Sequence, residues 1–390
     1  MTLCVSLLIA SEFMPVSLLT PIASDLHATE GQAGQAISIS GLFAVVTSLL
    51  IANVAGRFHR RTILVTLTLV MLASLGLIAA APNFTVLMAA RALLGITVGG
   101  FWALATATIM RLVPEESVPK ALGVLYTGNA VATAFATPLG SYLGAIIGWR
   151  GVFWALTPLV FINVIWLWLS LPSIPPEGPI PVAKVLGLLK RRTVAFAMAG
   201  VMLTFGGAFG MFTYFRPFLE NYTHVTVPQL SLLLLALGVA GFFGTTLAST
   251  LVARHLNRLL IGLPVLLAVV SLGLFTARHS ITGVTVMMFL WGVINSAIPV
   301  AWATWVSRGV RDEPEAGGGL MVAAIQLAIM LGAALGGLLL DWISIGATFA
   351  GGGIFLVSAA LVLGYERRTA RIEATTVEAE PAQEPVLAES

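Results

Sequence analysis

The chain has 390 residues, of which 58% are hydrophobic and only 9% are charged, and its mean hydropathy is +0.98. About a quarter of the residues of a soluble globular protein are charged. This composition therefore excludes an ordinary soluble protein and indicates a polytopic membrane protein.

Apolar windows of about 20 residues, the length that crosses roughly 30 Å of hydrocarbon as a helix, recur along the sequence. Lipid offers no partner for a free backbone group, and the alternating pattern of a membrane barrel is absent from the sequence. The predicted fold class is therefore an all-α polytopic membrane protein. Twelve transmembrane helices are expected near residues 3–21, 33–55, 62–81, 85–110, 119–147, 150–171, 193–219, 229–253, 258–277, 281–307, 316–341 and 345–365.

The first window contains a carboxylate, Glu12, followed by Pro15 and Pro21. A carboxylate within a membrane span costs several kcal/mol unless it faces a cavity, pairs or takes up a proton. Every other Asp and Glu, and all five histidines, fall in loops, at span ends or in the tail. Glu12 is therefore the predicted proton carrier. The alternative is a structural role, in which Glu12 hydrogen-bonds a neighbouring helix or lies near the outer interface.

The basic residues predict the orientation in the membrane. Sixteen of the 20 Lys and Arg residues fall on one side, in the loops after spans 2, 4, 6, 8 and 10 and in the tail. The positive-inside rule then places both termini in the cytoplasm. The basic balance is a topology signal, and we expect no nucleic acid as a partner.

An internal repeat is visible at a separation of about 200 residues. Residues 12–15 are echoed by residues 214–217, and Leu139-Gly140 returns as Leu335-Gly336. Trp102, Arg111, Pro114 and Glu115 have the spacing of Trp302, Arg311, Pro314 and Glu315. Such a duplication predicts two pseudo-symmetric six-helix halves with a site between them. The expected domains are a first half at 1–171, a Pro-rich cytoplasmic linker at 172–192, a second half at 193–365 and a disordered cytoplasmic tail at 366–390.

Several motifs resemble the major facilitator superfamily, in its twelve-span drug/proton antiporter branch. Gly56-Arg57-Phe58-His59-Arg60-Arg61 is similar to the loop 2–3 signature, with Gly56 in place of its usual aspartate. Arg91-Ala-Leu-Leu-Gly95 resembles an element associated with proton coupling. Thr137-Pro138-Leu139-Gly140-Ser141-Tyr142-Leu143-Gly144 resembles the antiporter motif of exporters. The resemblance implies gating or motif roles for Arg57, Arg61, Pro138, Gly140 and Gly144, and a location in the bacterial inner membrane.

More narrowly, the strings Gly100-Phe101-Trp102-Ala103, Phe212-Thr-Tyr-Phe-Arg-Pro217 and Ile325-Gln326-Leu327-Ala328 resemble the purine ribonucleoside efflux permeases. This resemblance implies export of inosine- or guanosine-like nucleosides in exchange for protons, by alternating access. Sugar exporters of the arabinose-efflux type share part of the pattern. A proton-coupled exporter of drugs or sugars is therefore the alternative hypothesis. A membrane protein without a transport function is a less favoured one.

Arg91 is the candidate cation that tunes Glu12, because a nearby cation favours the charged carboxylate whereas burial disfavours it. A structural role, in which Arg91 braces the packing of neighbouring helices, is an equally good interpretation. A nucleoside needs flat apolar surfaces and hydrogen-bonding side chains. The candidate substrate-binding residues are Phe101, Trp102, Asn129, Tyr214, Arg216, Trp302 and Gln326. For the aromatic residues ordinary packing is the alternative, and for Arg216 it is snorkelling toward the interface.

The expected partners are a small-molecule substrate, protons and the lipid bilayer, with the chain acting as a monomer. The one cysteine, Cys4, excludes an intramolecular disulfide and a cysteine-based metal site. The glycine run 317–319 lacks the Lys-Ser/Thr of a phosphate loop, so no ATPase is expected. We expect no cofactor, no metal site and no catalytic residue.

Overall fold

The computed structural model describes residues 1–114, 118–176, 178, 181–310 and 312–379, and all regular elements within these ranges are helical. The predicted all-α fold class is confirmed. The elements are α1 (Thr2–Ser17), α2 (Leu19–Asp25), α3 (Glu30–Ala55), α4 (Arg60–Ala79), α5 (Phe84–Leu112), α6 (Val118–Ser170), α7 (Val182–Gly187), η2 (Leu188–Lys190), α8 (Arg192–Phe212), α9 (Phe215–Phe218), η3 (Leu219–Thr223), α10 (Val227–Thr276), α11 (Ile281–Gly309), α12 (Pro314–Trp342) and α13 (Ile345–Ala379).

Among the described residues, ten helical segments are long and apolar enough to cross a membrane, two of them within α10, which His255 interrupts. Helices α1 and α2 form an eleventh span that is bent by 67°. The twelfth lies within α6, whose 53 residues would measure about 80 Å if straight. Gly148 breaks α6 with a φ of 72°, a left-handed conformation that glycine adopts without a Cβ penalty. The break divides α6 into two spans, which agrees with the twelve predicted crossings.

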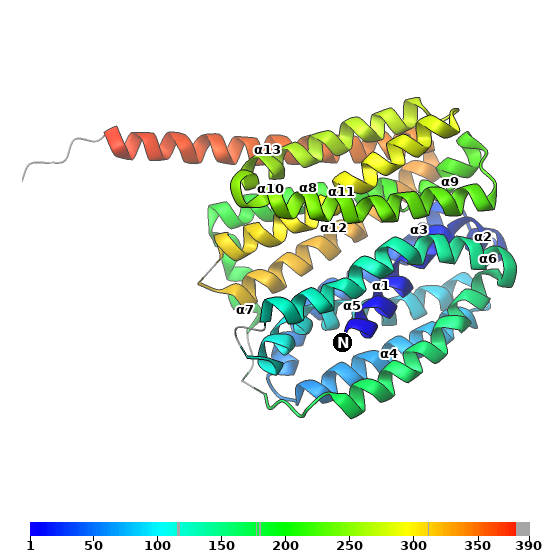
Figure 1. Ribbon diagram of the computed structural model, residues 1–390, viewed down its shortest axis with the longest axis horizontal. Helices are drawn as coiled ribbons and strands as arrows, with labels where there is room; N and C mark the ends of the chain where they lie inside the picture. Colours follow the sequence, from blue (N-terminus) through cyan, green and yellow to red (C-terminus); the bar gives the residue numbers. More distant parts are fainter. Residues whose placement is uncertain (115–117, 177, 179–180, 311, 380–390) are drawn as a thin grey trace, which may run out of the picture.

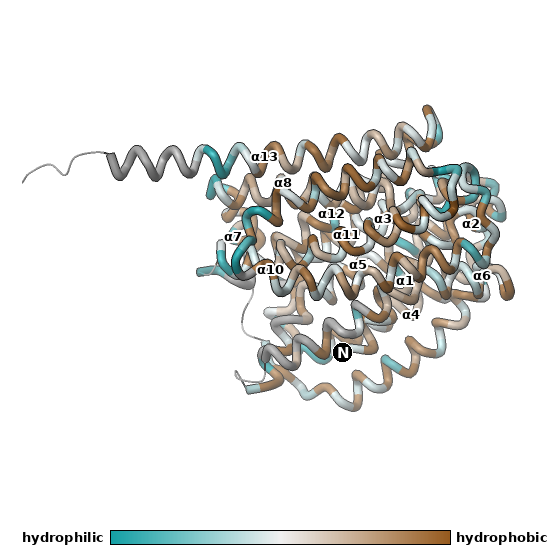
Figure 2. The backbone as a smooth tube through the Cα atoms, turned by 45° about the horizontal axis from the view of Figure 1, so that its top comes forward, coloured by the Kyte–Doolittle hydropathy of each residue, from teal (hydrophilic) through white to brown (hydrophobic). Residues whose placement is uncertain are grey.

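The helices form two halves, α1–α6 and α8–α13, joined through the connector that contains α7 (Figure 1). Helix α3 packs against α12, and α6 packs against α10, so these two helix pairs hold the halves together. Figure 2 shows hydrophilic segments gathered toward the two ends of the bundle and hydrophobic backbone between them, as a membrane protein requires. We call these ends the α7 end and the α9 end.

The repeat is visible in the backbone. Only two non-glycine residues of the described chain have positive φ, His27 (52°) and His224 (54°), and each follows the first broken span of its half. Two residues later, Thr29 and Thr226 cap the next helix. In each case the side-chain oxygen of a glutamine three positions later accepts a hydrogen bond from the threonine N–H. The distance is 2.9 Å for Gln32 and 2.8 Å for Gln229, and the contact completes a capping box. The same start signal thus recurs 197 residues apart.

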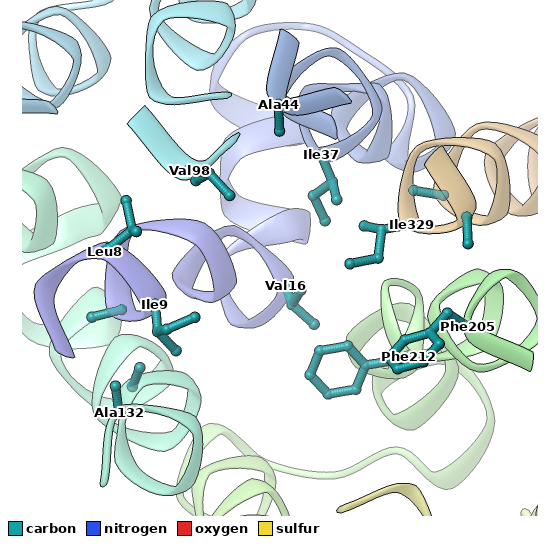
Figure 3. Packing of buried hydrophobic residues seen from close by; sticks show 14 of the residues in the cluster. Leu8, Ile9, Val16, Ile37, Ala44, Val98, Ala132, Phe205, Phe212 and Ile329 are labelled. Atoms are coloured by element: carbon teal, nitrogen blue, oxygen red, sulfur yellow. The ribbon is translucent and has the colours of Figure 1, made fainter. Parts of the chain in front are cut away.

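The buried core continues across the interface between the halves. In Figure 3, Val16 of α1 and Ile37 of α3 point toward Phe212 of α8 and Ile329 of α12. Helix α13 extends to Ala379, past residue 366, where the sequence analysis places the start of a disordered tail. The disordered tail stays a prediction. Residues 380–390 lie outside the described residues.

Candidate functional site

Glu12 lies on α1, nearly two turns before the break at Leu18, and is only 6% exposed. The local sequence explains why a backbone carbonyl of this part of the helix accepts a hydrogen bond from another helix. Pro15 has no N–H, so the carbonyl of Ser11 four residues earlier loses its usual helical donor. Arg91 of α5 replaces that donor, because its Nη1 lies 2.9 Å from the Ser11 oxygen.

Arg91 is fully buried and directs its donors to backbone carbonyls of two other helices. Its Nε donates to the Ala36 oxygen of α3 at 3.0 Å, and its Nη2 lies 3.5 Å from the Glu12 backbone oxygen. The guanidinium also attracts the Glu12 carboxylate electrostatically. Arg91 therefore both braces the packing and acts as the cation beside Glu12, so the two readings of the sequence meet in one residue.

The structure brings Gln326 of the opposite half to the same place. Its side chain on α12 is 6% exposed and approaches the Glu12 carboxylate, yet no hydrogen bond of 3.5 Å or less to a described residue satisfies Nε2. A buried amide donor without a partner costs about 1–3 kcal/mol, and such a group commonly serves a function. Glu12 and Gln326 thus face each other across the interface between the halves.

An aromatic cluster that the sequence analysis missed adjoins Glu12. Phe13 contacts Phe209 and Phe212 of α8, with ring centroids 5.8 and 6.0 Å apart. Phe212 in turn stacks on Trp291 of α11 at 5.9 Å. The indole Nε1 of Trp291 is buried and has no hydrogen-bond partner among the described residues. One clue was present in the sequence, since Phe13 lies in the first repeat segment, residues 12–15, and Phe212 begins the string 212–217.

Arg216 and Tyr214 lie at the α9 end, at the contact between the halves. Pro21, like Pro15, removes a helical donor, and it frees the carbonyl of Ser17. Arg216 donates to that oxygen and also to Oε1 of Glu220, at 2.8 Å from both Nε and Nη2. The Tyr214 ring is fully buried, and its hydroxyl donates to the Ala333 oxygen at 2.7 Å.

The other predicted substrate residues lie elsewhere. Phe101 is fully buried, Trp102 is partly buried against the core, and Asn129 is partly buried on α6. Trp302 is 2% exposed and packs on the Trp305 ring within the C-terminal half. Trp302 therefore packs within its own half, whereas Arg91 and Gln326 lie beside Glu12.

The residues of the exporter-like motif form a packing seam. A Cβ on Gly140 would lie 2.6 Å from the Ser17 hydroxyl oxygen, and one on Gly144 would lie 2.4 Å from Leu18. Pro138 is buried in the same helix. The motif therefore packs α6 closely against α1 at the break in the first span.

The loop 2–3 signature lies at the α7 end. Arg57 is exposed there, whereas the guanidinium of Arg61 lies 4.7 Å above the ring of Trp168, as in a cation–π contact. Nearby, Arg191 holds Asp312 with hydrogen bonds of 3.0 and 2.6 Å, which keep the pKa of the Asp312 carboxyl below its ordinary value.

The side-chain hydrogen bonds that join the two halves in the described part of the chain gather at the α9 end. Thr20 of α2 bonds Glu220 at 2.7 Å, and Asp341 of α12 accepts from Thr29 and from the Gly31 N–H. Gln35 donates to the Ala334 oxygen at 3.2 Å. The halves are therefore fastened to each other at the α9 end.

The fold and this site define a membrane transporter built from two halves. A model of the major facilitator superfamily matches residues 1–318, and the chain belongs to that family. The chain is 47% identical, over 92% of its length and 90% of the relative's, to the transcription regulatory protein OpdE of Pseudomonas aeruginosa. It is 40% identical to the purine ribonucleoside efflux pump NepI of Salmonella paratyphi B, covering 94% of this chain and 92% of the relative.

Solved structures agree on the fold. A bacterial homologue of the human lysosomal transporter Spinster has a TM-score of 0.75 at 17% identity and covers 94% of this chain and 95% of its own. The nucleoside transporter NupG, as its D323A mutant, has a TM-score of 0.73 at 14% identity and covers 94% and 97%. The predicted family and its fold are thereby confirmed.

Replacing Arg91 with lysine should destabilise the protein although the charge is kept. A lysine ammonium cannot reach the Ser11 and Ala36 carbonyls together in the fork geometry of a guanidinium. Leaving a buried carbonyl unpaired costs about 1–3 kcal/mol. We expect thermal unfolding of Arg91→Lys in detergent several degrees below that of the wild type. Arg254→Lys, at an exposed site, is the control; an unchanged unfolding temperature for Arg91→Lys would show that the bracing carries no weight.

Proposed function

We propose that this protein exports purine ribonucleosides in exchange for protons, by alternating access between its two halves. The observation that carries the proposal is the buried Glu12 carboxylate, which lies beside Arg91 in one half and Gln326 in the other. A carboxylate in a membrane span that takes up and releases a proton couples that proton to movement of the halves.

Support for the substrate class comes from the chemistry around Glu12. The Phe13, Phe209, Phe212 and Trp291 rings offer flat apolar surfaces, and the Gln326 amide and Trp291 indole offer unsatisfied donors. A purine nucleoside presents a flat ring and several hydrogen-bond acceptors, so the two sets are complementary. The NepI relatives, named purine ribonucleoside efflux pumps, favour the same class.

The name of the Pseudomonas aeruginosa relative concerns transcription. We place this chain with the efflux pumps because Glu12, Arg91 and Gln326 are buried between two membrane-spanning halves, where a transport site is expected. We also propose that the protein acts as a monomer in the bacterial inner membrane. The basic residues of the α7 end support a cytoplasmic location for that end and for both termini.

The test is transport in proteoliposomes loaded at acidic pH. Protons leaving the vesicles should drive accumulation of radiolabelled inosine, and accumulation should stop when a protonophore collapses the gradient. Arabinose and a cationic drug are measured in parallel. Gradient-driven accumulation of arabinose or the drug with no inosine flux would overturn the nucleoside assignment, and flux insensitive to the gradient would overturn proton exchange.

Removing the ring of Phe13 should weaken nucleoside binding more than it weakens the fold. Stacking of a base on an aromatic ring contributes about 1–3 kcal/mol. We therefore expect Phe13→Ala to raise the KM for inosine roughly tenfold. Phe196, which packs on Tyr365 away from Glu12, supplies the control Phe196→Ala. Equal KM values for the two variants would remove Phe13 from the substrate site.

A further inference from the structure

A second group of carboxylates lies at the α9 end, where the halves meet. Glu30 begins α3 in the N-terminal half, and Glu220 and Asp341 come from the C-terminal half. Glu220, Asp341 and the guanidinium of Arg216 are the charged groups that act on Glu30, and Thr20 of α2 is its hydrogen-bond partner. Three carboxylates therefore gather at a contact that must separate whenever the α9 end opens, and the Arg216 guanidinium acts on two of them, Glu30 and Glu220.

The Thr20 hydroxyl lies between two carboxyl groups, Glu30 and Glu220, but has a single hydrogen to donate. The Thr20 hydroxyl oxygen lies 3.1 Å from Oε1 of Glu30 and 2.7 Å from Oε2 of Glu220. A hydroxyl carries a single hydrogen, so it donates fully to only one acceptor. A proton on one of the two carboxyl groups would supply the second hydrogen bond.

The surroundings indicate which carboxyl group carries that proton. Glu220 accepts hydrogen bonds from the Arg216 guanidinium, whose Nε and Nη2 each lie 2.8 Å from Oε1. Asp341 accepts from the Thr29 hydroxyl and from the Gly31 N–H at 3.0 Å, in the first turn of α3, where a helix favours an anion. The same helix end also favours a negative charge on Glu30, but its hydrogen-bond donor is the Thr20 hydroxyl, which it shares with Glu220. Glu30 also faces the carboxyl groups of Glu220 and Asp341. Like charges at one site disfavour joint ionisation, so Glu30 is the group left to hold the proton.

We propose that Glu30 is a second protonation site of the transport cycle, and that its proton closes the α9 end. The proposal rests on the alternating access described under Proposed function and adds a group that is distinct from Glu12. With the proton present, the contact Glu30–Thr20–Glu220 joins the halves. When the proton leaves, Glu30 and Glu220 face each other as anions with one donor between them, and the contact opens.

The test measures the separation of the halves directly. Ser24 and Asn221 are exposed at the α9 end, one on each half. Spin labels on Ser24→Cys and Asn221→Cys, in a Cys4→Ser background, report the distance between them; we call this the α9-end label pair. The short-distance population should dominate at pH 5 and decrease toward pH 8.5. For release of one proton, the ratio of closed to open molecules should fall about tenfold per pH unit above the midpoint.

Three variants separate the possible outcomes. Glu30→Gln keeps a donor toward the Thr20 oxygen without the charge, so its closed population should not depend on pH. Thr20→Val removes the shared hydroxyl and should open the α9 end even at pH 5. Glu366→Gln, at the other end of the molecule, should respond to pH as the wild type does.

Repeating the titration in Glu12→Gln distinguishes this proposal from proton coupling at Glu12. The pH response of the label pair should persist there, and it is read as a distance, so it does not depend on whether inosine is the substrate. A wild-type distance that does not change with pH, or a wild-type pH response in Glu30→Gln, overturns the proposal. Loss of the response in Glu12→Gln also overturns it, since the titrating group would then be Glu12.

Discussion

Glu12→Gln should abolish proton-driven accumulation of nucleoside while leaving exchange of nucleoside for nucleoside in place. Glutamine has nearly the same shape, keeps an oxygen toward Gln326 and cannot take up a proton at physiological pH. Positioned proton transfer contributes on the order of 10²-fold or more to a rate, so the loss in gradient-driven flux should be of that order. Acid-loaded proteoliposomes measure the coupled flux, and vesicles preloaded with unlabelled inosine measure exchange.

The control for this experiment is Glu366→Gln, which removes a carboxylate from α13 far from the interface between the halves. It should retain full gradient-driven flux. If Glu12→Gln accumulates inosine as the wild type does, the coupling proton is carried elsewhere. If Glu12→Gln and a second variant, Glu12→Asp, both lose exchange as well as coupled flux, Glu12 serves the structure of the site instead.

The sequence predicted the number and type of the membrane spans because these depend on local composition. Even the division of α6 was predicted, since the charged and glycine-containing string from Gly148 to Arg150 separates two apolar windows. The sequence also placed Glu12 and Arg91 inside apolar windows, and both are buried in the structure.

What the sequence left undetermined are the contacts between segments far apart in the chain. The prolines of the first span were noted, yet nothing local shows that Arg91 and Arg216 supply the donors that Pro15 and Pro21 lack. Helical periodicity likewise does not indicate that Phe13 meets Phe212, about 200 residues later. Such pairs are set by the packing of the two halves, and a single sequence does not indicate which residues of one half face which residues of the other.

Tyr214 illustrates the same limit at a residue with a predicted role. It is a candidate substrate ligand by its position in the repeat, and the structure places it in a tight gap between the halves. A Cβ on Gly34 of α3 would lie 2.0 Å from the Tyr214 hydroxyl oxygen, and one on Gly337 of α12 would lie 2.4 Å from it. The ring therefore fits only because both flanking helices present glycine.

Gly34→Ala should hold the α9 end open and nearly stop transport. The added methyl group meets a rigid, fully buried ring that has no free space on its other side. Overpacking of this kind costs about 1–3 kcal/mol, and only the state in which the halves touch bears that cost. The balance between closed and open molecules should then shift roughly 5- to 150-fold toward the open state. The α9-end label pair should report the long distance at pH 5, where the wild type is closed.

Gly76→Ala is the matched control, because a Cβ at Gly76 of α4 meets nothing within 4 Å. It should leave both the distance and the flux unchanged. Gly34→Ala combined with Tyr214→Ala restores the missing space, so closure should return in part even though the Ala333 carbonyl loses its hydroxyl partner. A Gly34→Ala protein that closes at pH 5 and transports normally would show that Tyr214 moves aside, and that this close approach does not govern the opening of the α9 end.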